Sequence, residues 1–325
     1  YLGRASQVAF RVEEPARLAV VATDEQDLKQ KLEQSIGQLS QHPTEAFSLP
    51  TGLYYAHGVQ PGGIALMFSG QGSQYLYMGA DVAMAFDEAR AIWDLAASIP
   101  MAEEMALHEV VFPKPVFSEE EEALQRQRLI STDWAQPGVG AVGAALLAVL
   151  HTLGIEPDGL CGHSFGELSA LCAAGRMDLD TLLHLAITRG RLMAAAGRNT
   201  GGMLAVIGSL DKLEHLIEET KPGVILANRN SPSQGVLSGP TDAINQAEKR
   251  CRQNGFKTVR LPVSAAFHSS LVKEAQKPFS QAIEKIDLIP SKIPAFSNTT
   301  GAPYPADAEK AKELLAGHLL SPVDL

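Results

Sequence analysis

Several features that would mark particular classes of protein are scarce in this sequence. Its 325 residues include three cysteines, at positions 161, 172 and 251, whose spacing matches no pattern of metal ligands. The longest apolar run, residues 139–153, is too short to cross a bilayer and is interrupted by glycines. We therefore expect neither a metal site nor a membrane span, and we infer a reducing, cytoplasmic setting.

Positively charged residues are also few. The chain has 27 lysines and arginines against 37 acidic residues, which gives a formal net charge of -10. Such a balance argues against nucleic acid as a partner. The hydrophobic content of 45% is ordinary for a globular protein, and the length suits one large domain or two to three small ones.

The most informative motif is the string GHSFG at residues 162–166. Its form, G-x-S-x-G, is that of the nucleophile elbow, in which serine occupies a strained turn between a strand and a helix. The pattern predicts a short buried strand at 158–161 and a helix of small and apolar residues at 167–175. Such a turn exposes the Ser164 hydroxyl and directs the N–H groups of the new helix toward a developing oxyanion.

A serine nucleophile needs a general base, and His268 is the candidate among nine histidines because it follows a strand-like segment. His163, beside the serine, is expected to be a packing residue. The remaining candidates are expected to be ordinary surface or core residues: His42, His57, His108, His151, His184 and His215.

No obvious triad acid precedes His268 in the Ser-Asp-His order of the α/β-hydrolases. Asp211 and Asp242 are the nearest acids, and both are expected to cap helices. We therefore expect a Ser–His dyad whose imidazole is oriented by a main-chain carbonyl.

Two further segments could complete a site. Arg189 lies on a predicted helix, residues 179–196, and its planar guanidinium suits a carboxylate, although an exposed helical arginine is the commoner case. Gly190 beside it would let a backbone or a ligand approach closely. The string SGQGSQ at 69–74 follows a predicted strand at 64–68 and lacks the lysine of a phosphate-binding loop, but it could present the Gln71 N–H as a second oxyanion donor.

Elsewhere the pattern predicts ordinary elements. In the first sixty residues we expect a strand at 17–22, a helix at 24–39 capped by Asp24, and loops at 42–43 and 49–52. One face of that helix would consist of Leu28, Leu32, Ile36 and Leu39. Further helices are predicted at 81–98 and 139–153, and the acidic stretch 118–127 is expected to be a solvated face or a loop.

The pattern changes over residues 201–263. Strands are predicted at 203–208, 224–227, 234–238 and 258–261, and helices at 210–219 and 241–254. The order β-α-β-β-α-β is that of a ferredoxin-like unit. We expect this unit to be an insertion, because candidate chemistry resumes after it.

Taken together, the motifs resemble those of the malonyl-CoA:ACP acyltransferase family, which includes acyltransferase domains of type I polyketide and polyunsaturated fatty acid synthases. The matching strings occur in the family's order: FSGQGSQ at 68–74, GHSFGE at 162–167, RGRLM at 189–193, GGMLAV at 201–206, NRNSP at 228–232, AFHS at 266–269 and HLLSPV at 318–323. The match covers residues 62–325, and the combination is far more specific than any single string.

The resemblance implies an α/β fold. An α/β-hydrolase-like large subdomain, residues 62–200 and 264–325, would carry an inserted ferredoxin-like small subdomain, residues 201–263. A small α/β linker unit, residues 1–61, would precede them and looks like the segment that joins a ketosynthase to an acyltransferase.

The resemblance also implies an activity, the transfer of a malonyl unit from coenzyme A to the phosphopantetheine thiol of an acyl carrier protein through a seryl ester. Ser164 would be acylated and His268 would be the base. The N–H groups of Gln71 and Phe165 would form the oxyanion hole, and Arg189 would hold the malonyl carboxylate.

The substrate pocket would also include Met193, Phe267 and His318. No permanently bound cofactor is expected, and the partners would be the carrier protein, the coenzyme A thioester and neighbouring synthase domains such as a ketosynthase. Ala265 and Ser69 depart from the family's usual histidine and proline, and the first of these bears on the choice of acyl unit.

Two other functions stay open on the sequence alone. A serine thioesterase or esterase would share the elbow, but it would not need Arg189 and would usually show a triad acid. A non-catalytic scaffold domain is disfavoured because serine, histidine and arginine are all present. A basic set could dock an acidic carrier protein or be a solvated helix face: Lys249, Arg250, Arg252, Lys257 and Arg260.

Overall fold

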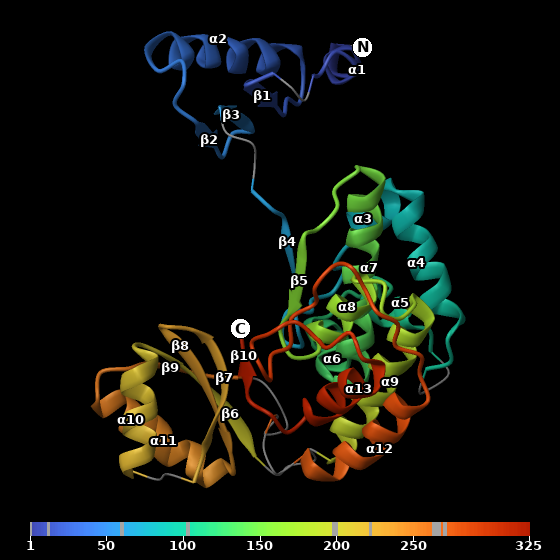
Figure 1. Ribbon diagram of the computed structural model, residues 1–325, viewed down its shortest axis with the longest axis vertical. Helices are drawn as coiled ribbons and strands as arrows, with labels where there is room; N and C mark the ends of the chain where they lie inside the picture. The colour runs from blue at the N-terminus through green and yellow to red at the C-terminus, as the bar shows by residue number, and fades with distance from the viewer. Residues whose placement is uncertain are drawn as a thin grey trace. The chain divides into compact units, whose positions relative to one another are not determined.

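A computed structural model of the chain describes residues 2–11, 14–58, 62–101, 105–196, 201–220, 223–261, 268 and 272–325. The chain divides into two compact units, Tyr1–Gly62 and Gly63–Leu325 (Figure 1). All the motifs that carry the family resemblance lie in the second unit.

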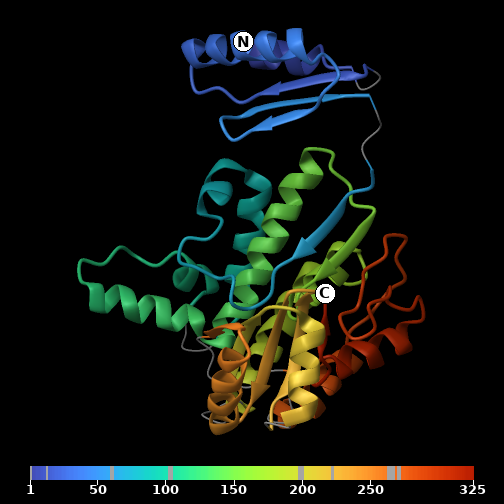
Figure 2. The ribbon, with the colours of Figure 1, turned by 90° about the vertical axis from the view of Figure 1, so that its left-hand side faces the viewer.

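The first unit is a small antiparallel sheet with a long helix over one face (Figure 2). Its strands have the order β1-β3-β2, and its elements are α1 (Leu2–Val8), β1 (Ala16–Val20), α2 (Glu25–Gln41), β2 (Phe47–Leu49) and β3 (Leu53–His57). The Asp24 side chain accepts a hydrogen bond from the Asp27 N–H at 2.8 Å, as the sequence predicts for a helix cap.

The loop expected at 49–52 in this unit is confirmed, while the expected apolar face of the long helix is wrong in part. The loop predicted at 49–52 is the turn of a β2–β3 hairpin, closed by Gly52 with a φ of 93°. The pattern predicts neither strand, because each is short and mixes polar with apolar residues. In α2, Leu32 and Ile36 are exposed while Ser35 is buried, so the helix packs along a stripe next to the one expected.

In the second unit, β4 (Ala65–Phe68) and β5 (Gly159–Gly162) form a parallel pair. Helices lie mainly to one side of this pair (Figure 1): α3 (Ala80–Ala85), α4 (Asp87–Ser98), α5 (Leu107–Val111), α6 (Glu119–Ile130), α7 (Thr132–Thr152), α8 (Gly166–Ala173), α9 (Leu179–Ala196), α12 (Lys273–Glu284) and α13 (Ala308–Gly317). Their apolar faces share one core with Phe68 of β4 and Leu160 of β5. The α/β fold therefore brings the end of β5 and the start of α8 against several long helices.

Two helices differ from their predicted bounds, and a stretch predicted as a solvated face or a loop is a helix with a solvated face. The helix predicted at 81–98 is two helices, because Phe86 between them has an extended backbone with φ -127° and ψ 125°. The acidic stretch forms α6, whose first turn holds four exposed glutamates at the positive end of the helix dipole. Helix α7 begins at Thr132 rather than at residue 139 and includes Pro137.

Helix α7 has the length and the hydropathy of a membrane span, with a mean hydropathy of 1.3 over its best window. Half of that window is buried inside the protein, as in a core helix of a folded domain. Its small residues allow close packing, and a Cβ on Gly140 would lie 3.1 Å from the Phe165 ring.

A second sheet has the strand order β10-β7-β8-β6-β9. Its elements are β6 (Gly202–Ile207), α10 (Leu210–Thr220), β7 (Ile225–Ser231), β8 (Gln234–Gly239), α11 (Thr241–Gln253), β9 (Lys257–Arg260) and β10 (Val323–Asp324). Both helices lie on one face of the sheet (Figure 1), where they form a separate core with residues such as Leu204 and Leu237.

The predicted order of strands and helices over residues 202–261 is confirmed, with bounds that shift by a few residues. The sequence does not predict β10, which comes from the end of the chain and pairs parallel with β7. The C-terminal segment therefore links the second sheet to the region around Ser164.

Candidate active site

Ser164 lies on the turn between β5 and α8, in the predicted strand–turn–helix context. Its φ of 51° is rare for a residue with a side chain, so the turn is strained. The flanking glycines are needed because backbones nearly touch here. A Cβ on Gly162 would lie 2.0 Å from Gly166 C, and a Cβ on Gly166 would lie 2.2 Å from Phe68 O.

The imidazole of His268 joins the nucleophile to the main chain. Its Nε2 lies 2.8 Å from Ser164 Oγ, and its Nδ1 lies 3.0 Å from the Ser321 carbonyl oxygen. A carbonyl can only accept, so Nδ1 carries the proton and Nε2 has the lone pair that faces the hydroxyl. The imidazole thus contacts a main-chain carbonyl on the side away from Ser164.

Burial is the main reason that the pKa of His268 is lowered to about 3. The positive charge of Arg189 lowers the pKa further, and the hydrogen bond to Ser321 opposes the change. The ring is therefore neutral near pH 7 and can accept the proton of Ser164.

Arg189 on α9 is 1% exposed, and its Nη2 lies 3.3 Å from Ser164 Oγ. Its Nε has no hydrogen-bond partner among the described residues. Burial lowers the pKa of this guanidinium to about 10, while the negative charge of Glu167 opposes that change. Arg189 thus stays charged at neutral pH, and its Nε–H can donate a hydrogen bond to an anion.

Helix α9 reaches this position because Gly190 has no side chain. A Cβ there would lie 2.6 Å from the Thr132 carbonyl oxygen at the start of α7. The close approach that the sequence predicts at Gly190 is therefore to a backbone.

Phe165 follows Ser164 on the turn that leads into α8, and Gln71 lies on the loop after β4 and lines the cavity beside Ser164. The Ser164 N–H is already bonded to Asn298 Oδ1 at 2.8 Å, so Phe165 carries the next N–H along the turn. The Gln71 side chain donates to Thr132 Oγ1 at 3.1 Å and accepts from Gln136 Nε2 at 3.2 Å. These bonds fix the loop that carries the Gln71 N–H.

A cavity of about 160 Å³ connects these groups. Its wall contains Gln71, Ser164, Arg189, Met193 and His268, together with Gln136, His163, Met203, Ala205, Asn228, Asn230, Gln234, Val236 and Leu261. Five of the eight predicted site residues thus line one cavity, although Ser164 and His268 are 104 positions apart.

The other three predicted site residues have different positions. Phe165 is fully buried at the start of α8. His318 lies behind His268, with ring centroids 5.5 Å apart, and does not line the cavity. Phe267 and the neighbouring Ala265 lie outside the described residues.

Sequence reasoning misses a buried polar cluster behind the nucleophile. Glu167 and His318 are fully buried, Asn298 is 3% exposed and Tyr304 is 7% exposed. His163, predicted to be a packing residue, lies beside Asn230, with Nε2 2.9 Å from Oδ1. Glu167 stands in the GHSFGE string, but nothing in the sequence shows that residues 298, 304 and 318 surround it.

The remaining histidines and the cysteines lie outside the cavity that contains Ser164. The six histidines expected to be ordinary residues are all exposed. Cys161 and Cys172 are half-buried, Cys251 is buried, and all three are free thiols. Within the described residues no three histidine, cysteine or acidic side chains are grouped so that they could hold a metal ion.

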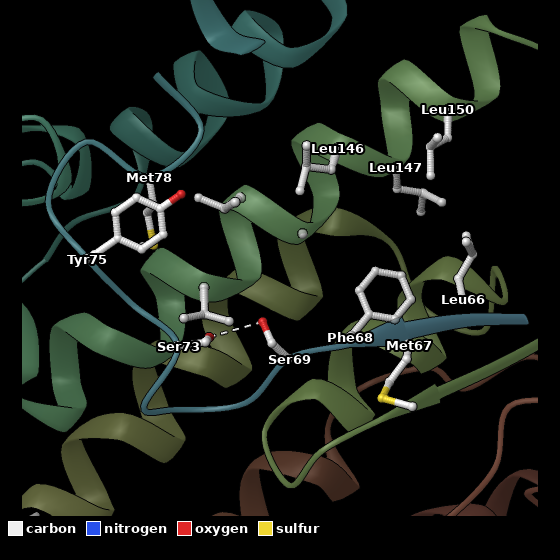
Figure 3. A pocket seen from close by; sticks show the side chains of 13 residues that line it. Leu66, Met67, Phe68, Ser69, Ser73, Tyr75, Met78, Leu146, Leu147 and Leu150 are labelled. Carbon is white, nitrogen blue, oxygen red and sulfur yellow. Dashed lines mark hydrogen bonds between the residues drawn. The ribbon is translucent and has the colours of Figure 1, made fainter. Parts of the chain in front are cut away.

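A larger cavity, about 340 Å³, lies between β4 and α7 (Figure 3). Leu66 and Phe68 face Leu147 and Leu150 across it, and the Ser69 and Ser73 hydroxyls bond to each other at 3.0 Å. No histidine, acid or base is among the described residues that line this space. The smaller cavity, where polar and ionisable groups converge, is therefore the candidate active site.

Comparison with known proteins agrees with this geometry. Residues 66–321 match the family described as "Acyl transferase domain". The chain belongs to this family. The resemblance inferred from the motifs is thus confirmed.

Relatives of the acyl transferase family that resemble the chain include synthases and free-standing enzymes. The chain is 32% identical over 324 residues to a polyunsaturated fatty acid synthase protein of Thraustochytrium, covering 95% of this chain and 11% of that protein. It is 32% identical over 266 residues to the malonyl CoA-acyl carrier protein transacylase of Bacillus subtilis, covering 80% of each. The chain therefore spans about a tenth of the synthase protein and most of the length of the transacylase.

Solved acyltransferase structures share the α/β fold. The malonyl CoA-acyl carrier protein transacylase of Coxiella burnetii aligns with a TM-score of 0.73 at 29% identity, covering 81% of each chain. The acyltransferase domain from the second module of the salinomycin polyketide synthase aligns with a TM-score of 0.75 at 30% identity, covering 95% of this chain and 68% of that one.

Proposed function

We propose that this acyltransferase moves a malonyl unit from coenzyme A to the phosphopantetheine thiol of an acyl carrier protein through an ester on Ser164. The observation that supports this most strongly is that a hydroxyl, a neutral imidazole and a buried cation meet in one cavity. Transacylases of this name are among the relatives, and one similar solved structure is a complex of a malonyl-transacylase with an acyl carrier protein.

In the first half-reaction, Ser164 Oγ attacks the thioester carbonyl while His268 Nε2 takes the hydroxyl proton. The carbonyl oxygen becomes an oxyanion and accepts hydrogen bonds from the Gln71 and Phe165 N–H groups, each donor contributing about 10²–10³ in rate. The intermediate collapses to the seryl ester, and the thiolate of coenzyme A leaves with the proton from His268.

In the second half-reaction, the phosphopantetheine thiol gives its proton to His268 Nε2 and attacks the ester carbonyl. The same two N–H groups hold the second oxyanion. The bond between Ser164 Oγ and the acyl carbon then breaks, and the serine regains its proton from His268. The enzyme returns to its starting state with the acyl unit on the carrier.

Arg189 binds the free carboxylate of the malonyl group in this account. Charge-assisted hydrogen bonds to a buried guanidinium are roughly twice as strong as neutral ones, so the pair both selects the acyl unit and places the thioester. Met193 and His318 complete the acyl site in this proposal, Met193 in the cavity wall and His318 by packing behind the base.

A serine thioesterase or esterase is the alternative reaction. The site favours transfer, because a hydrolase has no need of a buried cation 3.3 Å from the nucleophile. The test is to incubate the purified chain with malonyl-CoA and a holo acyl carrier protein. We expect malonyl thioester on the carrier. Release of free malonate at the same rate with and without the carrier would overturn the proposal in favour of hydrolysis.

The same proposal includes the organisation of the chain. An α/β-hydrolase-like catalytic subdomain, residues 62–200 and 264–325, would hold a ferredoxin-like insertion, residues 201–263, after a linker unit of residues 1–61. The division of the chain near residue 62 and the separate five-stranded sheet support it. We also propose neighbouring synthase domains such as a ketosynthase, because the chain spans 11% of a polyunsaturated fatty acid synthase protein. A cytoplasmic setting and the lack of a permanently bound cofactor belong to the same proposal.

Carrier docking on the insertion would use its basic residues. Arg252 and Arg260 both pair with Glu248, which reduces the charge that they offer to a partner. Lys249 and Lys257 form no ion pair with other described residues, so they are the better candidates for contact with an acidic carrier.

A further inference from the structure

A buried carboxylate lies directly behind the nucleophile and takes no part in the steps above. Glu167 is in the first turn of α8, three residues after Ser164, and its side chain is fully buried. Its Oε1 accepts a hydrogen bond from the Tyr304 hydroxyl, and its Oε2 accepts one from the Asn298 N–H at 3.0 Å. Both oxygens therefore face donors from a distant part of the chain, 131 and 137 residues after Glu167.

Asn298 connects this carboxylate to the nucleophile. Its Oδ1 accepts the hydrogen bond of the Ser164 N–H at 2.8 Å, and its own main-chain oxygen accepts one from the Asp324 N–H at 2.9 Å. Asn298 is 3% exposed, so water does not readily replace these bonds. The contacts run from Glu167 through Asn298 to the backbone of Ser164.

The bond from Asn298 has a consequence for the strained turn. Ser164 has a φ of 51°, a conformation that persists only where surrounding contacts hold it. Fixing its N–H fixes this conformation, which in turn sets the 2.8 Å contact between Ser164 Oγ and His268 Nε2. It also leaves the next N–H, that of Phe165, to face the reacting carbonyl.

We propose that Glu167 and Asn298 form a positioning relay, in which the Glu167 carboxylate holds the Asn298 main chain and the Asn298 amide holds the Ser164 N–H. Neither residue touches substrate, so both are positioning residues. The inference deepens the proposed function and rests on it for the acyl-transfer readout, but reactivity of Ser164 toward a neutral reagent tests it separately.

Asn298→Ala is the principal test because it removes the acceptor of the Ser164 N–H and leaves Arg189 and its surroundings in place. We expect kcat for malonyl transfer to fall by about 10²-fold, the cost of a misplaced reacting group, with KM for malonyl-CoA changed less than about twofold. Labelling of Ser164 by phenylmethylsulfonyl fluoride, which has no carboxylate, should slow by a similar factor.

Thr299→Val is the matched control. The neighbouring Thr299 hydroxyl is buried and has no hydrogen-bond partner among the described residues, and valine has nearly the same shape. This variant should keep the wild-type rate of labelling. If it slows as much as Asn298→Ala, general disturbance of the segment explains the loss and the relay is wrong.

Glu167→Gln and Glu167→Ala separate hydrogen bonding from charge. The glutamine oxygen can still accept the Asn298 N–H while its amide donates to the Tyr304 oxygen, so labelling should stay within about threefold of wild type. Glu167→Ala should lose as much as Asn298→Ala. Equal losses in both Glu167 variants would show that the charge beside Arg189 matters and that the relay does not.

Tyr304→Phe keeps the proposal testable if the alanine variants do not fold, as near-ultraviolet circular dichroism would reveal. It removes one donor to Glu167 and should slow labelling several-fold without changing KM. An unchanged labelling rate would contradict the relay.

Two outcomes separate the relay from the proposed function. A wild-type chain that the sulfonyl fluoride labels but malonyl-CoA does not acylate would contradict the proposed function alone. If the wild-type chain reacts with both reagents and Asn298→Ala reacts at the wild-type rate, the relay alone is contradicted. A wild-type Ser164 that the reagent does not label at all would count against the relay, because it presumes a reactive serine.

Discussion

The Nδ1 atom of His268 lies 3.0 Å from the main-chain oxygen of Ser321, 53 residues further along the chain. A carbonyl fixes the tautomer of the imidazole as a triad carboxylate does, but it adds no negative charge. Burial and the nearby charge of Arg189 then keep the ring neutral. The proton affinity of the base is thus set by its surroundings, and this leads to two predictions about pH.

The first prediction concerns the rate of acylation. Because the pKa of His268 is lowered to about 3, the base is already in its neutral form across the usual range of pH. The rate constant for acylation of Ser164 by malonyl-CoA, measured by rapid quench, should be flat between pH 5 and 8. A tenfold fall for each pH unit below 6.5 would show an ordinary histidine and contradict the assignment.

The second prediction concerns stability. The folded pKa of His268 is below the unfolded value of 6.5, so the unfolded chain binds the proton more readily between them. The free energy of unfolding is therefore unaffected by protonation of this residue above pH 6.5 and decreases as the pH falls toward 3. The decrease is about 2 kcal/mol at pH 5. Urea unfolding should show a steeper decline between pH 6.5 and 5 for wild type than for His268→Gln. Parallel curves would contradict the prediction.

Substitution of Arg189 should change which acyl unit is used. Arg189→Ala should lower kcat/KM for malonyl-CoA by about 10²-fold, because a charge-assisted pair with the carboxylate is lost. Acetyl-CoA has no carboxylate and should lose far less. Competition between the two thioesters checks this, and equal losses for both would favour a general structural role or a hydrolase.

Gly190→Ala should destabilise the second unit. The new Cβ would lie 2.6 Å from Thr132 O and 2.9 Å from Asp133 Cα, which forces α9 away from α7. We expect a loss of about 1–3 kcal/mol in urea unfolding, typical of overpacking. Gly317→Ala in α13 is the control, because no described atom beyond its chain neighbours and its own helix backbone lies within 4 Å of the added Cβ. Equal effects of the two changes would contradict this reason for the glycine.

Removal of residues 1–62 should spare the chemistry. These residues form a compact unit of their own, and the described residues that line the cavity around Ser164 all belong to the second unit. A chain that begins at Gly63 should acylate Ser164 at a rate within about twofold of the longer one. A loss of folding, seen by circular dichroism, would show that the first unit is needed.

Local signals in the sequence predict much of this fold. Helix α9 has its predicted bounds, 179–196, and the β-α-β-β-α-β order over 202–261 follows from short apolar runs between turns. The break at Phe86 is not predicted, because apolar residues continue through it. The early start of α7 is not predicted, because Pro137 and Gly138 resemble the end of a loop. Strand β10 is two residues long and exists only because β7 offers it an edge.

Local signals in the sequence likewise predict some residues of the candidate site and miss others. Ser164, His268 and Arg189 can be inferred because each lies in a recognisable string with a chemical reason for its residue type. Glu167 and Asn298 cannot, since their roles depend on a contact across 131 positions that no local pattern encodes. The carbonyl of Ser321 is a main-chain group, so its position depends on the path of the chain and not on its side chain.

The central claim, that Ser164 carries the acyl group, can be tested by peptide mass spectrometry. The purified chain would be incubated with malonyl-CoA without a carrier protein, quenched in acid and digested. The account predicts one malonyl group on the peptide that contains Ser164, and none in Ser164→Ala. A malonyl group on another residue of the wild-type chain, or no adduct in a folded protein, would contradict it.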